Sequence, residues 1–429
     1  MLSSFYIRNF RSIIELRLDF SFAEGKAPNG HKSLEVMPFL EAEDGRRMVP
    51  CLAFFGANAT GKSNLLKAYS TLQQLVRNGG GLADLFDPNK LHPRFDDTTL
   101  ELQFIVGRHA FSYRITYSHA SISEERLLKD GDLVFEVHDL TPKFSGAILS
   151  PAYPHEKLAD ILRVECSDGE GRQTKPFLHR IGKDYPGLHP DLRKVHGHIG
   201  DSVKFFGNDG PMLLPVAVKI LAETMDGDQS AALREITDMV RRADIDISSI
   251  SITETQLGPE DPPQRGTITK HDRETGSRHA VSIGVTHMDV GGNPVLLNFL
   301  KHESAGTQRL AGLVGLILYA LKTGGVFLVD ELDCSLHPLL MREIVLLFKR
   351  RRSNPRGAQL VFTTHNTDIL DDSILRLSEI ALVRKTPANG TMVRRLVDVR
   401  DDGDDIRNVT NFRRQYLAGF YAGVPHPAL

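Results

Sequence analysis

The sequence predicts an α/β fold: a mixed sheet with flanking helices, an antiparallel β lobe and an inserted α+β lobe. Short apolar runs at Cys51–Phe55 and Val326–Val329 are typical of buried strands, and each precedes a loop and a helical pattern. Residues 99–117 alternate apolar and polar side chains on both sides of Gly107, which indicates an antiparallel hairpin. Between 121 and 280 the pattern weakens, and prolines and glycines interrupt it.

The length of the chain, 429 residues, exceeds that of one ordinary domain. We expect a discontinuous principal domain formed by residues 1–120 and 280–429. Residues 121–279 would interrupt it as an inserted lobe, which is a candidate region for partner binding or dimerisation.

Composition narrows the class of protein. The formal net charge of −2 gives no global attraction to nucleic acid or membranes, although a local basic patch stays open. Three cysteines without metal-type spacing indicate a reducing compartment. No apolar stretch is long enough to span a bilayer, and the N-terminus lacks the pattern of a secretory signal. We therefore expect a cytoplasmic protein with no membrane partner.

The first elements follow from local patterns. Residues 4–20 alternate like strands, with a break at 9–12. Segment 21–47 is rich in glycine, proline and charge, and predicts a loop or an irregular hairpin. A helix is expected over 64–77, where the glycines at 79–81 end it.

The later elements are expected as follows. Helices are predicted near 154–163, 212–226, 231–243, 303–321 and 338–350, and strands at 281–290, 326–329 and 359–362. The repeated succession of strand and helix after residue 303 indicates a nucleotide-binding type of sheet.

Residues 54–63 read F-F-G-A-N-A-T-G-K-S and match the phosphate-loop pattern G-x-x-x-x-G-K-[ST] at every fixed position. The loop joins a strand to a helix, where backbone N–H groups and the helix dipole favour an anion. Lys62 would reach the β- and γ-phosphates, and the Ser63 hydroxyl would bind Mg²⁺. The predicted nucleotide contacts are Gly56, Ala57, Asn58, Ala59, Thr60, Gly61, Lys62, Ser63 and Asn64.

Two adjacent carboxylates follow the apolar run Val326–Val329. Asp330 at the strand end would hold Mg²⁺ through its water shell. Glu331 would lie beyond the metal and polarise the attacking water. A strand that merely happens to end in these two residues is the alternative, which the upstream phosphate loop makes less favourable.

A second anion site is predicted at 303–309, which reads E-S-A-G-T-Q-R and opens a helix. Ser304 and Gly306 would suit the γ-phosphate of a nucleotide held by a partner subunit. A plain helix cap made by Ser304 is an equally weighted alternative. After the strand at 359–362, His365 could hydrogen-bond the γ-phosphate or the attacking water, and a structural histidine is the alternative.

In this order, the motifs resemble those of the ATP-binding-cassette (ABC) branch of the P-loop ATPases, among the SMC, RecF and OLD-like heads. They are N-F-R-S at 9–12, G-A-N-A-T-G-K-S at 56–63, E-S-A-G-T-Q-R at 303–309, L-V-D-E-L-D-C-S-L-H-P at 328–338 and T-T-H at 363–365. The chain is more narrowly similar to the compact bacterial AAA-15 or RloA-like ATPases, which share D-E-L-D-x-S-L-H-P and a tail like that at 416–425. The resemblance covers about 1–120 and 280–429.

The resemblance implies an ABC-type head that hydrolyses ATP with Mg²⁺. It implies that Arg11 approaches the bound phosphates and that Asp333 communicates across a dimer interface. Ser304, Gly306 and Thr307 would contact ATP held by the other protomer, and His365 would be the switch histidine. Transporter-type cassettes have Gly-Gly-Gln where this chain has Ala-Gly-Thr at 305–307, and Gln103 is interpreted as a solvent-facing strand residue rather than a glutamine-loop residue.

The implied assembly is a homodimer or higher homo-oligomer closed around ATP. The narrower resemblance implies a sensor or regulatory ATPase of bacterial anti-phage defence, with a separate nuclease-like effector. The competing interpretation is a DNA-repair or chromosome-maintenance ATPase of the RecF or SMC type, which binds DNA directly.

Two further patterns are given a structural interpretation. His196 and His198 lack clustered partners for a metal, so we expect a solvated loop there. The arginines at 350–352 with Arg356 could touch nucleic acid, but a basic helix C-terminus is also expected from the helix dipole.

Overall fold

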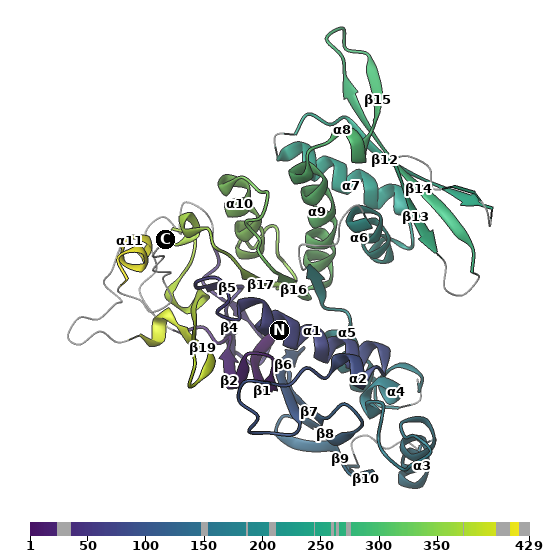
Figure 1. Ribbon diagram of the computed structural model, residues 1–429, viewed down its shortest axis with the longest axis vertical. Coiled ribbons are helices and arrows are strands. Elements are labelled where there is room, and N and C mark those ends of the chain that lie inside the picture. Colours follow the sequence, from purple (N-terminus) through teal and green to yellow (C-terminus); the bar gives the residue numbers. More distant parts are fainter. Residues whose placement is uncertain are drawn as a thin grey trace. The chain divides into compact units, whose positions relative to one another are not determined.

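The structure is a computed structural model (Figure 1). It describes residues 1–23, 36–146, 153–185, 188–205, 212–243, 245–258, 261–262, 266–271, 276–371, 373–399 and 412–419. Residues 420–425 of the tail-like motif at 416–425 and residues 24–35 of segment 21–47 lie outside the described residues.

The chain forms two compact units. Unit 1 contains Met1–Lys204, Gly324–Glu331 and Ile344–Leu429, and unit 2 contains Phe205–Thr323 and Leu332–Glu343. These boundaries differ from the predicted ones at 121 and 279, and the function expected of the inserted lobe stays a prediction.

Unit 1 is built on a 13-stranded mixed sheet with the order β10-β9-β8-β7-β6-β1-β2-β19-β18-β5-β17-β16-β11, so the predicted α/β fold is confirmed. Its strands are β1 (Leu2–Phe10), β2 (Ile13–Asp19), β5 (Cys51–Phe55), β6 (Thr98–Val106), β7 (His109–Tyr117), β8 (Ile122–Lys129), β9 (Asp132–His138), β10 (Thr141–Phe144), β11 (Val203–Phe205), β16 (Val326–Val329), β17 (Gln359–Thr363), β18 (Ile380–Thr386) and β19 (Gly390–Arg395). β3 (Leu40–Glu41) and β4 (Arg47–Met48) form a separate two-stranded sheet.

Strands β18, β5, β17 and β16 run parallel to one another. Every residue of β5, β16 and β17 is buried, and their apolar runs match the strands expected from the sequence. Strands buried on both faces show a continuous apolar run because neither face meets water. The parallel part therefore brings the carboxyl ends of β5, β17 and β16 to one edge.

Strands β10 to β6, β1, β2 and β19 form the antiparallel part of the sheet. β6 and β7 form the predicted hairpin around Gly107, which has φ 60°. β8 to β10 extend this sheet, although residues 122–144 were expected in the inserted lobe. The sequence pattern of β8 is obscured because Glu125, a carboxylate, occupies an inward position where an apolar side chain is expected. The carboxylate accepts hydrogen bonds from Tyr113, Gln173 and the backbone N–H of Phe177 at 2.9, 2.7 and 2.6 Å.

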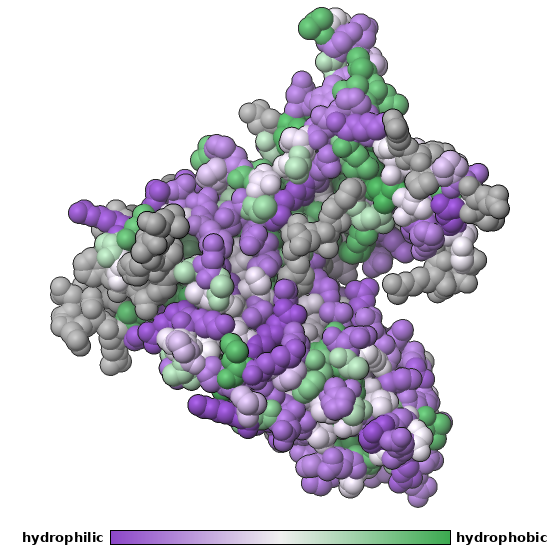
Figure 2. All heavy atoms as spheres, in the orientation of Figure 1, coloured by the Kyte–Doolittle hydropathy of each residue, from purple (hydrophilic) through white to green (hydrophobic). Residues whose placement is uncertain are grey.

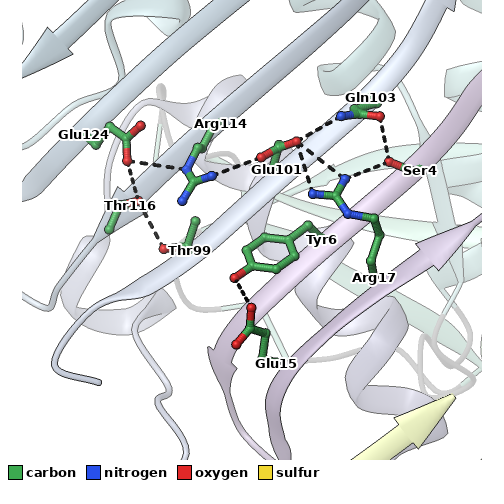
Figure 3. A network of polar contacts seen from close by, with 10 residues as sticks. All are labelled: Ser4, Tyr6, Glu15, Arg17, Thr99, Glu101, Gln103, Arg114, Thr116 and Glu124. Atoms are coloured by element: carbon green, nitrogen blue, oxygen red, sulfur yellow. Dashed lines mark hydrogen bonds and ion pairs between the residues drawn. The ribbon is translucent and has the colours of Figure 1, made fainter. Parts of the chain in front are cut away.

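One face of the antiparallel part carries a polar network (Figure 3). Glu101 pairs with Arg17 on β2 at 3.5 Å and with Arg114 on β7 at 3.2 Å, and Arg114 also pairs with Glu124 at 3.4 Å. Gln103 lies on β6 as expected and joins the network through Ser4. Because each arginine drawn faces a carboxylate, this network concentrates no positive charge for nucleic-acid phosphates.

Helices cover the sheet of unit 1. They are α1 (Lys62–Asn78), α2 (Leu82–Leu85), α3 (His155–Glu165), α4 (Phe177–Lys183), α5 (Pro190–Gly200) and α11 (Phe412–Leu417), while α10 (Pro338–Lys349) has residues in both units. α1 packs against α4 and α5. The Gln73 amide donates to the Gly200 carbonyl at 3.0 Å, and Tyr69 pairs with the Ser202 hydroxyl at 2.9 Å.

The expected solvated loop around His196 and His198 is wrong, because both residues lie on α5. Pro190 occupies the first turn of this helix, and the His189 side chain accepts from the Asp191 N–H. The His198 ring stacks on Phe104 at 4.7 Å, and burial lowers its pKa well below the ordinary value. Among the described residues, no group of three metal-binding side chains is suitably clustered.

Unit 2 combines helices with a four-stranded sheet. Its elements are α6 (Leu213–Ala222), α7 (Gln229–Arg242), β12 (Ser249–Leu257), β13 (Thr267–His271), β14 (Arg278–Met288), β15 (Pro294–Asn298), α8 (Phe299–His302) and α9 (Ala305–Thr323). α9 packs closely on α6 and α7, since a Cβ at Gly312 would overlap Leu213 and one at Gly315 would lie 2.8 Å from Ala217. The helices expected near 212–226 and 231–243 are confirmed.

The hairpin of β14 and β15 exposes apolar side chains (Figure 2). Met288 on β14 and Leu296 on β15 are 51% and 69% exposed. Within the part of the chain that the structure describes, no helix has the length and apolar character needed to cross a membrane.

Candidate nucleotide-binding site

The phosphate loop joins β5 to α1 as predicted. α1 begins at Lys62, two residues before the predicted start, with Gly61 as its cap at φ 100°. A Cβ at Gly56 would overlap the Val383 carbonyl, so the close approach of the neighbouring strand β18 requires the first glycine. Gly56, Thr60 and Lys62 are buried, Ala57, Gly61, Ser63 and Asn64 are half-buried, and Asn58 and Ala59 are exposed.

The Lys62 ammonium lies against its own loop. It donates to the Gly56 and Ala57 carbonyls at 2.8 and 2.9 Å. Thr60 Oγ1 also donates to the Ala57 carbonyl, at 2.9 Å. Because the first turn of α1 contains no acidic residue, the positive end of its dipole is not compensated there. The loop therefore presents a cation and a helix N-terminus together, which suits a phosphate.

The two predicted metal ligands are in contact. Ser63 Oγ donates to Asp330 Oδ1 at 3.1 Å, which joins the start of α1 to the end of β16. Thr363 Oγ1 donates to the same carboxylate oxygen at 2.6 Å. Hydroxyl and carboxylate oxygens are hard ligands of the kind that Mg²⁺ prefers, so this donor set fits the ion.

Glu331 leaves the strand in an unusual backbone conformation. Its φ is 50°, which is uncommon for a residue other than glycine, and its side chain is exposed whereas Asp330 is 9% exposed. The Glu331 N–H donates to Thr363 Oγ1 at 2.8 Å. Thr363 thus holds both carboxylate residues, one through its proton and the other through its oxygen.

His365 follows β17, the strand between β5 and β16. It is exposed. The neighbouring Thr364 N–H donates to the Phe54 carbonyl at 3.2 Å, which fixes the end of β17 beside the start of the phosphate loop. The strand order therefore supports the expected position of His365 near the phosphate loop. Its role as switch histidine stays a prediction.

The second predicted anion site lies in unit 2, at the start of α9. Ser304 is exposed and caps the helix, since its hydroxyl accepts from the Thr307 N–H at 3.1 Å and pairs with Thr307 Oγ1 at 3.0 Å. A Cβ at Gly306 would lie 2.7 Å from the Ser335 carbonyl. The helix cap that the sequence left as an alternative is therefore present, and contact with a partner's nucleotide stays a prediction. Asp333 is half-buried on the segment that follows Glu331.

Three comparisons report what the chain is similar to. The family model described as "AAA domain, putative AbiEii toxin, Type IV TA system" matches residues 234–371, a range that includes both carboxylates and the start of α9. No curated protein matches the sequence. The matched range is less than half of the chain and does not include the phosphate loop at 56–63.

Over this range the chain is similar to that family, and residues 56–63 carry a phosphate-loop sequence.

Solved structures show distant likenesses to this chain. An SMC head domain from Thermotoga maritima is 13% identical, with 93% of this chain and 99% of that chain covered and a TM-score of 0.40. An SMC head bound to the C-terminal winged-helix domain of ScpA is 13% identical, with coverage of 92% and 98% and a TM-score of 0.44. The recombination mediator RecF is 12% identical, with coverage of 90% and 96% and a TM-score of 0.37.

Arg11 lies in the turn between β1 and β2 with φ 51°. Its guanidinium Nε pairs with Asp87 Oδ2 at 2.9 Å, and its N–H donates to the Asp87 carbonyl at 2.8 Å. The nearby Asn9 side chain donates to the Phe95 and Asp97 carbonyls at 2.9 and 3.1 Å. The N-F-R-S segment thus organises the residues after α2, and the expected approach of Arg11 to phosphate stays a prediction.

Some site residues escaped the sequence interpretation. In the sequence, Thr363 stands out only as part of T-T-H, and its contacts with both carboxylate residues cannot be seen there because a threonine at a strand end is common. His287 on β14 pairs with Glu303 Oε1 at 2.7 Å. The Gln308 amide donates to the Glu303 carbonyl at 2.9 Å. Two contacts therefore hold the residue before Ser304, and no spacing in the sequence links positions 287 and 303.

Proposed function

We propose that the chain hydrolyses ATP to ADP and phosphate with Mg²⁺. The observation that carries this proposal is the contact of Ser63 with Asp330, which joins the phosphate loop to the carboxylate strand. Bound Mg²⁺ would neutralise charge on the phosphates, with Ser63 and Asp330 as its protein ligands. Lys62 would bind the β- and γ-phosphates, and Glu331 would orient and polarise the attacking water.

The proposed active assembly is a homodimer, or a higher homo-oligomer, that closes around ATP. The exposure of Ser304 supports it, because a helix N-terminus open to the outside can meet a nucleotide held by another protomer. Ser304, Gly306 and Thr307 would contact the partner's ATP. Arg11 is proposed to approach the phosphates, Asp333 to act at the dimer interface, and His365 to contact the γ-phosphate.

The biological role proposed is that of a sensor or regulatory ATPase in bacterial anti-phage defence, acting with a separate nuclease-like effector. The motifs shared with the AAA-15 or RloA-like ATPases support it, and the toxin–antitoxin wording of the matched family is compatible with a defence setting. Residues 121–279 stay the proposed partner-binding or dimerisation region, and the apolar hairpin of β14 and β15, which lies almost wholly beyond that range, is a further candidate contact.

The competing role is a DNA-repair or chromosome-maintenance ATPase of the RecF or SMC type. The paired charges of the Glu101 network favour the first role, since each arginine drawn in it faces a carboxylate. Duplex binding by purified protein, measured as a function of salt, separates the two. Steep salt-sensitive binding without a partner would favour the DNA-binding class.

Substitution of Glu331 by Gln tests the enzymatic proposal. The amide keeps the shape of the side chain but removes its charge, so ATP binding should persist while turnover falls on the order of 10²–10⁴-fold. ATP-bound dimer should accumulate, which light scattering with MgATP would show. An unchanged turnover rate would refute Glu331 as the group that activates water.

A further inference from the structure

A row of polar groups lies behind the phosphate loop and joins three separate segments of unit 1. The Asn64 amide of α1 donates to Ser12 Oγ, in the turn between β1 and β2, at 2.7 Å. Ser12 Oγ and Thr391 Oγ1 of β19 are 2.7 Å apart. Thr391 Oγ1 in turn donates to the Thr60 carbonyl of the loop at 2.8 Å.

The direction of every proton in this row is fixed. A carbonyl only accepts, so the single Thr391 proton is used on Thr60. Ser12 must then donate its own proton to Thr391 Oγ1. The Ser12 oxygen is left to accept from Asn64. Both hydroxyls donate once and accept once, and hydrogen bonds in such a chain strengthen one another.

The same residues form a wall directly behind Gly61. A Cβ at Gly61 would overlap Thr391 Oγ1 and would lie 2.6 Å from Ser12 Oγ. Thr391 is 1% exposed, and its N–H donates to the Ser12 carbonyl at 2.8 Å. This wall has little freedom to move, because backbone and side chain both connect its two members.

The wall acts on the loop through one peptide group. In a trans peptide the carbonyl of one residue and the N–H of the next point in opposite directions. Thr391 fixes the Thr60 carbonyl on the side of β19, so the Gly61 N–H points away from β19. That N–H belongs to the set of loop donors expected to meet phosphate oxygens.

We propose that Thr391 and Ser12 are positioning residues for phosphate binding, although both lie outside the phosphate-loop motif. They hold the peptide between Thr60 and Gly61 in the orientation that directs its N–H to the nucleotide. This inference rests on the proposed binding of ATP by the loop. It predicts that loss of the hydroxyls weakens nucleotide binding more than it slows the chemical step.

Thr391→Val removes the hydroxyl and keeps the branched shape. We expect MgATP to bind roughly tenfold more weakly by calorimetry, because a loop carbonyl loses its buried donor. KM for ATP should rise by a similar factor while kcat changes less than about twofold. Thr391→Ser restores the hydroxyl and should return the affinity to within about twofold of the original. Ser12→Ala should weaken binding less, by roughly threefold to fivefold.

Thr99→Val is a matched control. Thr99 is fully buried in β6, its hydroxyl pairs with Thr116 at 3.1 Å, and it lies in the network of Figure 3. Thr99→Val should lower thermal stability without changing the affinity for MgATP. Equal weakening by Thr99→Val and Thr391→Val, or unchanged affinity in folded Thr391→Val and Ser12→Ala, would overturn the inference. A wild-type chain that fails to bind MgATP would instead refute the proposed function, and the positioning role with it.

Discussion

The two elements predicted to face phosphate are built in different ways. The loop before α1 is tied to β18 and β19 and to the turn after β1, and its lysine is 6% exposed. The turn before α9 is exposed at Ser304, whose hydroxyl bonds only to Thr307 among the contacts described for it. A cross-braced loop whose Gly56, Thr60 and Lys62 are buried can hold a ligand within one chain, whereas an exposed helix cap is open to a ligand delivered from outside. The difference favours the proposal that each chain holds a nucleotide at its own phosphate loop and offers the turn before α9 to the nucleotide of a partner. We call these two elements the two half-sites of the chain.

The largest expected effects come from disabling each half-site separately. Lys62→Ala removes the ammonium proposed to bind phosphate and should abolish ATP binding and turnover. Ser304→Arg should spare ATP binding to the monomer but block hydrolysis, because a bulky cation replaces the small cap that would meet a partner's nucleotide. Mixing the two variants should restore part of the activity, since one composite site keeps both intact motifs.

Ser249→Arg is the control for this experiment. It introduces the same side chain at another exposed serine of unit 2, on β12, and should leave turnover within about twofold. If the mixture of Lys62→Ala and Ser304→Arg stays inactive at concentrations where heterodimers form, the shared-site proposal is wrong.

A smaller effect is expected at Thr363, which connects the two carboxylates of the first half-site. Thr363→Val leaves Asp330 with one hydrogen bond fewer and the Glu331 N–H without its acceptor. We expect kcat to fall roughly tenfold to a hundredfold, with ATP affinity changed less, because the displaced groups act on Mg²⁺ and water rather than on the loop. Thr363→Ser keeps the hydroxyl and should recover most of the rate in steady-state assays. A Val variant with wild-type kcat would remove Thr363 from the mechanism.

The sequence reveals the parts of this site whose chemistry is local. A phosphate loop has a fixed spacing, and a buried strand such as β16 shows itself as an apolar run, so Ser63 and Asp330 could be predicted. Thr391 could not, because its role depends on β19 pairing beside β2 and bringing a distant hydroxyl behind Gly61. The same limit explains β8, where Glu125 is buried only because partners far along the chain satisfy its carboxylate.

The smallest effect is expected for substitution of His287, which tests the exposed turn before α9. His287→Phe keeps a ring on β14 but leaves the Glu303 carboxylate, 11% exposed, without this partner. Because Glu303 precedes Ser304, the start of α9 should become less well positioned. We expect a roughly threefold to tenfold lower turnover with unchanged ATP binding to the monomer, and partial recovery in His287→Gln, whose amide can still donate.

His279→Phe provides the control on the same strand. His279 lies 3.4 Å from Glu254 and has no contact described with residues 303–308, so its loss should leave turnover near the original value. A loss in His279→Phe equal to that in His287→Phe would mean that β14 acts through general stability. A loss confined to His287→Phe, appearing only at protein concentrations that support dimers, would connect the hairpin of unit 2 to the complementary half-site.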